Sequence, residues 1–189
     1  KKKYSIFHIE GGLGKHIMAT AVAQCIKNNY PDRELIIVTA YPEIFLNIDF
    51  IDKVYRIGST PYFYQDYIEG KDSFIFRNEP YFTTDYINQT SHLIESWCDL
   101  FQLKYNEESP QLVFNRAQEL EATNFWNRDK PIMVIQTNGG PSTQDNINSW
   151  TRDMPHLISN EIVQSYSKDY HIIQVTRDNT FHLPGVEVI

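Results

Sequence analysis

The stretch YSIFHIEGGLGKHIMATAVAQCIKNNYPDRELIIVT, residues 4–39, carries the clearest fold signal in the chain. It begins with an apolar run at Tyr4–Ile9, passes through a glycine-rich turn, and ends within a second apolar run at Glu34–Ala40. Between the two runs, apolar residues recur every four positions, as in a helix, until Pro31 ends the pattern. A strand, a helix and a second strand in this order predict a βαβ unit with parallel strands.

Further apolar runs continue this alternation of strands and helices. Most of the runs are continuously apolar, which is typical of parallel strands that helices cover on both faces. Additional strands are predicted at Lys53–Ile57, Ser73–Phe76, Ile132–Thr137, His171–Thr176 and Val186–Ile189. Additional helices are predicted around Leu93–Phe101, over Gln118–Arg128 and over Pro155–Ser167. The predicted fold class is therefore α/β, with a Rossmann-like parallel sheet covered by helices.

A domain boundary is predicted near the middle of the chain. The composition turns polar around Asn127–Lys130, and a fresh strand begins at Pro131. This gives an N-terminal domain over 1–128 and a second domain over 129–189. The second segment holds a strand, a helix, a strand and the start of another strand, which is less than a complete Rossmann-like domain. We therefore expect a two-domain architecture whose second domain is incomplete.

Composition and charge narrow the function classes. The chain is 41% hydrophobic and 22% charged, as ordinary globular proteins are, and its formal net charge is −7. A general nucleic-acid binder needs a basic face, so the negative charge argues against nucleic acid as a partner. No stretch approaches the roughly 18 apolar residues of a membrane-spanning helix, and the beginning lacks a signal-peptide core. Cys25 and Cys98 are too few for a disulfide framework, so we expect a cytoplasmic protein.

The first glycine loop contains Gly11, Gly12 and Gly14, followed by Lys15 and His16. It lies between a predicted strand and a predicted helix, which is the position of an anion-binding site at a helix N-terminus. The loop of a phosphate-binding ATPase follows its lysine with Ser or Thr to hold magnesium, and His16 stands at that place here. A deviant phosphate-loop ATPase stays open as an alternative, as does a purely structural turn.

Two side chains of this loop are candidate catalytic groups. His16 can act as a general base or as a donor to phosphate, and the structural alternative is an exposed histidine at a helix start. Lys15 can neutralise a diphosphate with its ammonium group. We expect the three glycines to contact substrate, because glycine lets the backbone approach a ligand closely.

A second glycine loop repeats this layout after the predicted strand Ile132–Thr137. In open α/β sheets, ligands bind at the carboxyl ends of the strands, where both loops are expected to lie. Two such domains facing each other would place both loops on one interdomain cleft. The candidate donor-binding residues of this segment are Thr137, Asn138, Gly139, Gly140, Ser142 and Trp150.

Absent motifs argue against several other chemistries. The chain has no Asp-x-Asp, which makes a metal-dependent single-domain glycosyltransferase a poor fit. It has no Gly-x-Ser-x-Gly, which disfavours an α/β-hydrolase. The six histidines are scattered without the spacing of metal ligands, so no metal site is predicted.

Two aromatic-rich stretches, Tyr62–Tyr67 and Tyr81–Tyr86, are open to two interpretations. They can be core aromatics that anchor loops, or they can form a wall that faces a sugar or an acceptor. Aromatic ring faces pack well on the apolar faces of sugars, which is the basis of the second interpretation.

The segment GGLGKHIMATAVAQCIKNNYPDRELIIVT, residues 11–39, resembles the opening of the heptosyltransferase-like glycosyltransferases, family 9 of the glycosyltransferases. Tyr30-Pro31 before the second strand fits the family, as do Trp150 and Pro155 after the second loop. The resemblance implies a GT-B fold, in which an acceptor-side domain and a donor-side domain face each other across a cleft. It also implies metal-independent transfer with inversion from a nucleotide-sugar donor to an acceptor hydroxyl. No cofactor is expected beside these substrates.

The resemblance further implies a carbohydrate or glycolipid acceptor and, with a glycolipid, peripheral membrane association. One departure from the family stands out. Many members carry an aspartate directly after the last glycine of the loop as the catalytic base, whereas this chain has Lys15 there. Three alternatives follow. His16 takes over the base role, the base lies elsewhere, or the chain is a catalytically inert binding module on the same fold.

Overall fold

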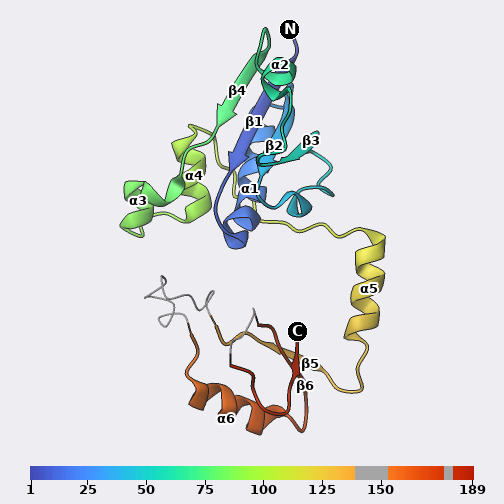
Figure 1. Ribbon diagram of the computed structural model, residues 1–189. Coiled ribbons are helices and arrows are strands. Elements are labelled where there is room, and N and C mark those ends of the chain that lie inside the picture. The colour runs from blue at the N-terminus through green and yellow to red at the C-terminus, as the bar shows by residue number, and fades with distance from the viewer. Residues whose placement is uncertain (139–152, 177–180) are drawn as a thin grey trace. The chain divides into compact units, whose positions relative to one another are not determined.

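The computed structural model describes residues 1–138, 153–176 and 181–189 (Figure 1). The chain divides into two compact units, Lys1–Asn115 and Arg116–Ile189, and each unit is described by itself. The sequence analysis placed the boundary after residue 128. The helix that precedes this point is therefore grouped with the second unit rather than with the first.

The first unit is built on a four-stranded parallel sheet in the order β3-β2-β1-β4. The strands are β1 (Lys3–Ile9), β2 (Glu34–Thr39), β3 (Lys53–Arg56) and β4 (Asp72–Phe76). The helices are α1 (Leu13–Asn29), α2 (Phe63–Tyr67), α3 (Thr84–Ile87) and α4 (Leu93–Leu100), with 3₁₀ turns η1 (Pro42–Ile44) and η2 (Pro80–Phe82). The chain enters at the middle of the sheet, moves out to β3, and then returns to β4 on the other side of β1, as in the first half of a Rossmann-type fold.

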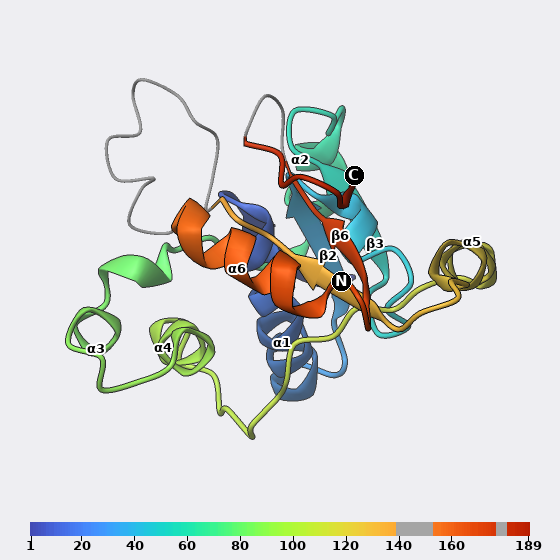
Figure 2. The same cartoon turned by 90° about the horizontal axis from the view of Figure 1, so that it is seen from below.

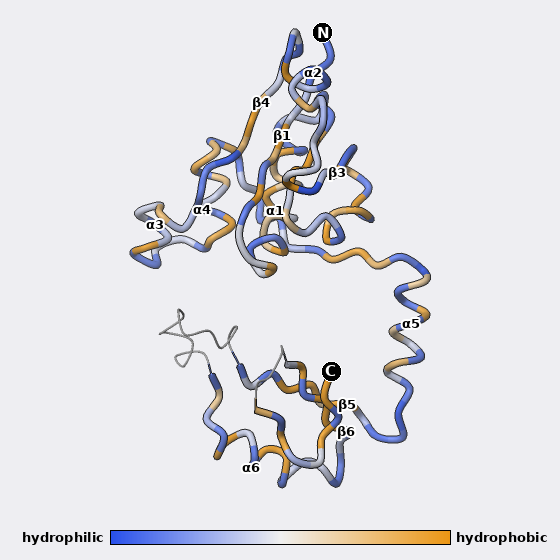
Figure 3. The backbone as a smooth tube through the Cα atoms, viewed as in Figure 1, coloured by the Kyte–Doolittle hydropathy of each residue, from blue (hydrophilic) through white to orange (hydrophobic). Residues whose placement is uncertain are grey.

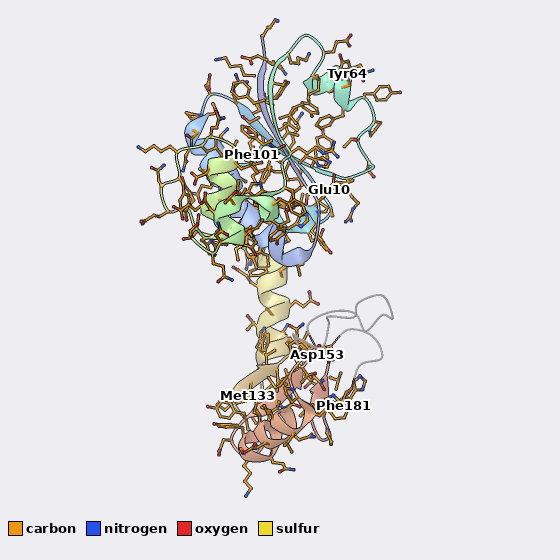
Figure 4. The ribbon with its side chains drawn as sticks, turned by 90° about the vertical axis from the view of Figure 1, so that its left-hand side faces the viewer. Glu10, Tyr64, Phe101, Met133, Asp153 and Phe181 are labelled. Carbon is orange, nitrogen blue, oxygen red and sulfur yellow. The ribbon has the colours of Figure 1, made fainter. Side chains whose placement is uncertain are left out.

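Helices cover the two faces of this sheet unequally. On one face, α1 and α4 lie side by side and form the main core with Phe7, Ile37 and the buried Trp97 (Figure 2). On the other face, the short α2 contributes Tyr67 to a smaller core with Tyr4. Figure 4 shows this division, with Phe101 on the α4 side of the sheet and Tyr64 of α2 on the opposite side.

Buried strands account for this layered core. In β2, five of the six residues are buried, which requires cover on both faces. The helix α1 meets the sheet through small residues such as Ala19 and Ala23, which let it pack closely. Figure 3 shows β4 coloured hydrophobic along most of its length, although only Phe76 of this edge strand is buried.

The second unit contains a three-stranded parallel sheet in the order β5-β6-β7. Its strands are β5 (Ile132–Ile135), β6 (His171–Gln174) and β7 (Glu187–Val188), and its helices are α5 (Arg116–Trp126) and α6 (His156–Tyr166). The core of the described part is small and consists of Ile135, Val163, Ile172 and Leu183. The helix α5 has no buried residue.

The predicted α/β fold class is confirmed, because every predicted strand is present and both sheets are parallel. The short helices α2 and α3, both in the aromatic-rich stretches, were not predicted. No helix among the described residues is long and apolar enough to cross a membrane.

Candidate functional site

The first glycine loop connects β1 to α1 at the carboxyl edge of the four-stranded sheet. Gly11 has a φ of +105°, and a Cβ added there would lie 3.2 Å from Cδ of Lys15. Gly12 and Gly14 are exposed, and a Cβ on either residue would meet no heavy atom within 4 Å. Gly11 is therefore required by the backbone and by the packing of Lys15. Gly12 and Gly14 leave open surface that a ligand can approach.

Lys15 is buried, with only 5% of its side chain exposed. Its ammonium forms an ion pair and hydrogen bond with the carboxylate of Glu79. The Lys15 Nζ also lies 5.2 Å from the centre of the Trp97 ring and 5.6 Å from that of Tyr81, so two ring faces flank the charge. These partners compensate the loss of water around a buried cation.

The pairing of Lys15 with Glu79 bears on the chemistry that the sequence predicts for this lysine. In a phosphate-loop ATPase the lysine must reach the β- and γ-phosphates. Here the Lys15 ammonium is held by Glu79 instead, so the geometry does not favour the ATPase alternative. A role of Lys15 against a sugar diphosphate stays a prediction, and such a ligand would have to share the ammonium with Glu79.

Glu79 is the residue of this site that the sequence analysis did not select. It follows β4, and β4 pairs with β1, so Glu79 and the glycine loop lie at the same edge of the sheet. Its side chain is 38% exposed, and its Oε2 accepts the hydrogen bond from Lys15. Its other oxygen, Oε1, is shielded from solvent and has no hydrogen-bond partner among the described residues. Burial raises the pKa of the neighbouring Tyr81, and the charges of Tyr86 and Glu79 raise it further.

His16 is fully buried beneath the loop. Its Nδ1 lies 2.8 Å from the carbonyl oxygen of Gly12, and its Nε2 lies 3.3 Å from that of Ile9. Its ring packs edge-on against Tyr41, with ring centres 4.8 Å apart. A general base needs a lone pair that faces its substrate, and both ring nitrogens of His16 face backbone carbonyls instead. The geometry therefore favours His16 as a brace between the two ends of the loop, and a catalytic role for it stays a prediction.

A hollow of about 460 Å³ lies on the α2 side of the same sheet. Its floor is mostly apolar, and its polar lining includes His8 and Arg77. Arg77 pairs with Glu10 of the glycine loop at 3.1 Å. Burial lowers the pKa of His8, and the charge of Arg77 lowers it further while Glu10 acts in the opposite direction. The hollow therefore begins close to the glycine loop and extends across the sheet.

The second loop begins after β5 in the second unit. The buried Thr137 donates a hydrogen bond to Oδ1 of Asn138 at 2.9 Å and accepts one from Nε2 of Gln174 at 2.9 Å. Its carbonyl oxygen accepts from the N–H of Met154, close to the start of α6. Thr137 thus positions Asn138 and joins the end of β5 to Met154. Of the other predicted donor-binding residues, Gly139, Gly140, Ser142 and Trp150 lie outside the described residues.

Gln174 is a second residue that the sequence analysis did not select. It is fully buried at the end of β6. Beside its bond to Thr137, it donates to the carbonyl of Phe181 at 2.8 Å and accepts from the N–H of Leu183 at 2.8 Å. It therefore ties together the segments that follow β5 and β6. The only feature of the sequence that could have identified Gln174 is its position as an amide side chain at the end of an apolar strand.

The fold and the position of the glycine loop at the carboxyl edge of the sheet are Rossmann-like, and three solved structures have a similar fold. The chain is similar to a family 9 glycosyltransferase from Veillonella parvula, with 11% identity, a TM-score of 0.70, and 99% of this chain covered. It is also similar to the ADP-heptose heptosyltransferase II of E. coli, with 9% identity, a TM-score of 0.56 and 93% covered. A third similar structure is the iron-containing dodecameric glycosyltransferase TibC of enterotoxigenic E. coli, with 16% identity, a TM-score of 0.55 and 100% covered.

These comparisons confirm the predicted resemblance to heptosyltransferase-like glycosyltransferases at the level of the fold. The chain spans 68%, 65% and 48% of the three solved chains, which are longer than the part matched here. No family model and no curated protein sequence matches the chain.

Proposed function

We propose that this protein is a glycosyltransferase that moves a sugar from a nucleotide-sugar donor to an acceptor hydroxyl. The observation that supports this most strongly is the fold shared with a family 9 glycosyltransferase over 99% of the chain. The open surface at Gly12 and Gly14 adds to it, because that surface lies at the carboxyl edge of a parallel sheet.

The proposal assigns the two units different substrates. The first unit binds the acceptor, a carbohydrate or glycolipid, against the glycine loop and the adjoining hollow. The second unit binds the nucleotide sugar near Asn138. The N–H of Met154 bonds to Thr137, so the start of α6 lies beside the end of β5. A helix N-terminus with its unpaired N–H groups suits the diphosphate of such a donor.

The chemistry has two requirements. The acceptor hydroxyl must lose its proton, and the departing nucleoside diphosphate must be stabilised. The proposal includes inversion at the sugar and a reaction without a bound metal ion, both of which rest on the family resemblance. It also includes a cytoplasmic location, with peripheral attachment to membranes when the acceptor is a glycolipid.

Titration with nucleotide sugars tests the proposal. The full chain should bind at least one of ADP-heptose, UDP-glucose and GDP-mannose and release the nucleoside diphosphate slowly, with EDTA having no effect. Gly12→Ala should weaken binding or release at least fivefold while leaving the urea midpoint unchanged, because the added methyl group meets open space in the free protein. Absence of both binding and release across the panel would contradict the proposal and would favour an inert module.

A further inference from the structure

We propose that the carboxylate of Glu79 is the general base of this reaction and that Lys15 is its positioning residue. This inference rests on the proposed glycosyl transfer and deepens it. It assigns to a residue after β4 the proton transfer that the residue directly after the last loop glycine, Lys15, cannot perform. An ammonium group carries no lone pair and cannot accept a proton.

The strand order brings the two residues together. Glu79 is far from the glycine loop in sequence, but β4 lies directly beside β1, and both segments leave the sheet at the same edge. The Lys15 side chain, packed under Gly11, extends to Glu79 and donates to its Oε2. A carboxylate is thereby fixed at the glycine loop.

The two carboxylate oxygens of Glu79 have different surroundings, and the proposal gives each a different role. Oε2 is held by Lys15, and Lys15 is itself held between the rings of Trp97 and Tyr81. Oε1 is shielded and has no hydrogen-bond partner among the described residues. A buried charged oxygen without a partner is unfavourable, and a hydroxyl that donates to it would remove that cost. The Glu79 side chain as a whole is 38% exposed, so a rotation of its carboxylate would bring Oε1 to an acceptor hydroxyl beside the loop, which provides such a donor.

The other titratable groups at the loop are less suited to the task. His16 directs both ring nitrogens at backbone carbonyls. Among the described residues, the Lys15 ammonium from α1 and the Tyr81 phenol from η2 interact with Glu79.

The proposed transfer step needs no proton acceptor other than Glu79. The acceptor O–H gives its proton to Oε1 of Glu79, and the oxygen forms a bond to the anomeric carbon of the donor sugar. The bond from that carbon to the diphosphate oxygen breaks, and its electron pair leaves with the nucleoside diphosphate. Water in place of the acceptor gives donor hydrolysis by the same proton transfer.

Four variants of the full chain test this assignment: Glu79→Gln, Lys15→Met, the double variant Lys15→Met/Glu79→Gln, and Glu69→Gln. The double variant removes both charges together, so it leaves no unpaired buried lysine. Glu69 is an exposed glutamate that precedes β4, at the other end of that strand, and it serves as the matched control. The measurements are the kcat of nucleoside diphosphate release from the sugar nucleotide that the wild type hydrolyses, and the affinity for that sugar nucleotide.

We expect Glu79→Gln and the double variant to bind the sugar nucleotide within threefold of wild type and to lose at least about 100-fold in kcat. Lys15→Met should keep measurable release with a lowered kcat and an affinity within threefold of wild type, because the carboxylate loses the contact that holds it in place. Glu69→Gln should match the wild type. A purely structural ion pair would not lower kcat at unchanged affinity.

Two results would overturn the assignment while the proposed function stands. One is a folded double variant that releases diphosphate as fast as Lys15→Met. The other is full release in Glu79→Gln together with none in Lys15→Met. A wild-type protein that neither binds nor hydrolyses any member of the panel would contradict the proposed function, and the role of Glu79 would fall with it.

Discussion

At the scale of single residues, His16 shows how burial changes the meaning of a motif. In the sequence, its position directly after Gly-Lys suggested a catalytic role, because free histidine side chains titrate near neutral pH. In the folded chain its ring is enclosed by Tyr41 and Phe45, and its nitrogens join Ile9 to Gly12 across the loop. A residue that holds both ends of a loop contributes first to the shape of that loop.

His16→Ala should therefore destabilise the fold by about 2–4 kcal/mol, because it leaves a cavity and removes the contacts of the ring nitrogens with the carbonyl groups of Ile9 and Gly12. His16→Phe keeps the ring packing and should cost less. Urea denaturation followed by circular dichroism measures both. If His16→Ala instead unfolds at the wild-type midpoint yet abolishes diphosphate release, then His16 is the base and the bracing role is wrong.

At the scale of secondary-structure elements, the strands were predictable and the short helices were not. Parallel strands buried on both faces leave continuous apolar runs, so β1 and β2 were visible in the sequence. The helix α2 has only five residues, which is too short for a helical periodicity to show in the sequence. It begins after Tyr62, whose φ is +59°, and no side chain caps its N-terminus. Aromatic packing decides its place, with Tyr67 edge-on to Tyr4 at 5.1 Å.

The candidate site, like the fold, was only partly predictable from the sequence. The glycine loop was visible because its residue types require an unusual backbone, as the φ of Gly11 confirms. Glu79 was not visible, because its role depends on which strand lies beside β1. A sequence of strands does not reveal whether β3 or β4 occupies that place. Gln174 was missed for the same reason, since its partners belong to two different segments, those that follow β5 and β6.

The attachment of β7 to β6 gives a prediction for acid stability. Glu187 accepts a hydrogen bond from His171 at 2.6 Å and pairs with Arg128 at 3.3 Å. The bond from His171, followed by the charge of Arg128, lowers the pKa of Glu187 below its ordinary value of 4.5. Glu187 therefore stabilises the fold above that ordinary value, and the contribution disappears as the pH falls through the lower folded-state value.

Urea denaturation from pH 7 down to pH values below the folded-state pKa of Glu187 measures this contribution. Glu187→Gln should lower the midpoint at pH 7 and show a weaker loss of stability with acid than the wild type. Glu161→Gln, an exposed glutamate on α6, is the matched control and should retain the wild-type pH dependence. Parallel curves for wild type and Glu187→Gln would show that the ion pairs of Glu187 contribute nothing.

At the scale of the whole molecule, the two units differ in how much core each one holds. Both sheets and all three apolar clusters found among the described residues stay within one unit or the other. The first unit has a sheet with cores on both faces, and most residues of its central strands β1 and β2 are buried. The described part of the second unit has a cluster of four buried apolar residues. Folding free energy should therefore be concentrated in the first unit.

This asymmetry predicts the behaviour of the isolated units. A fragment of residues 1–115 should unfold cooperatively in urea, with a midpoint close to that of the main transition of the full chain. A fragment of residues 116–189 should show no cooperative transition, because the five apolar side chains that are buried among its described residues contribute too little apolar area to offset the entropy of ordering the chain. Trp97→Phe, which removes part of the main core, should lower the midpoint equally in the full chain and in the longer fragment. If residues 1–115 alone fail to unfold cooperatively, the first unit depends on contacts with the rest of the chain, and the two units form one cooperative body.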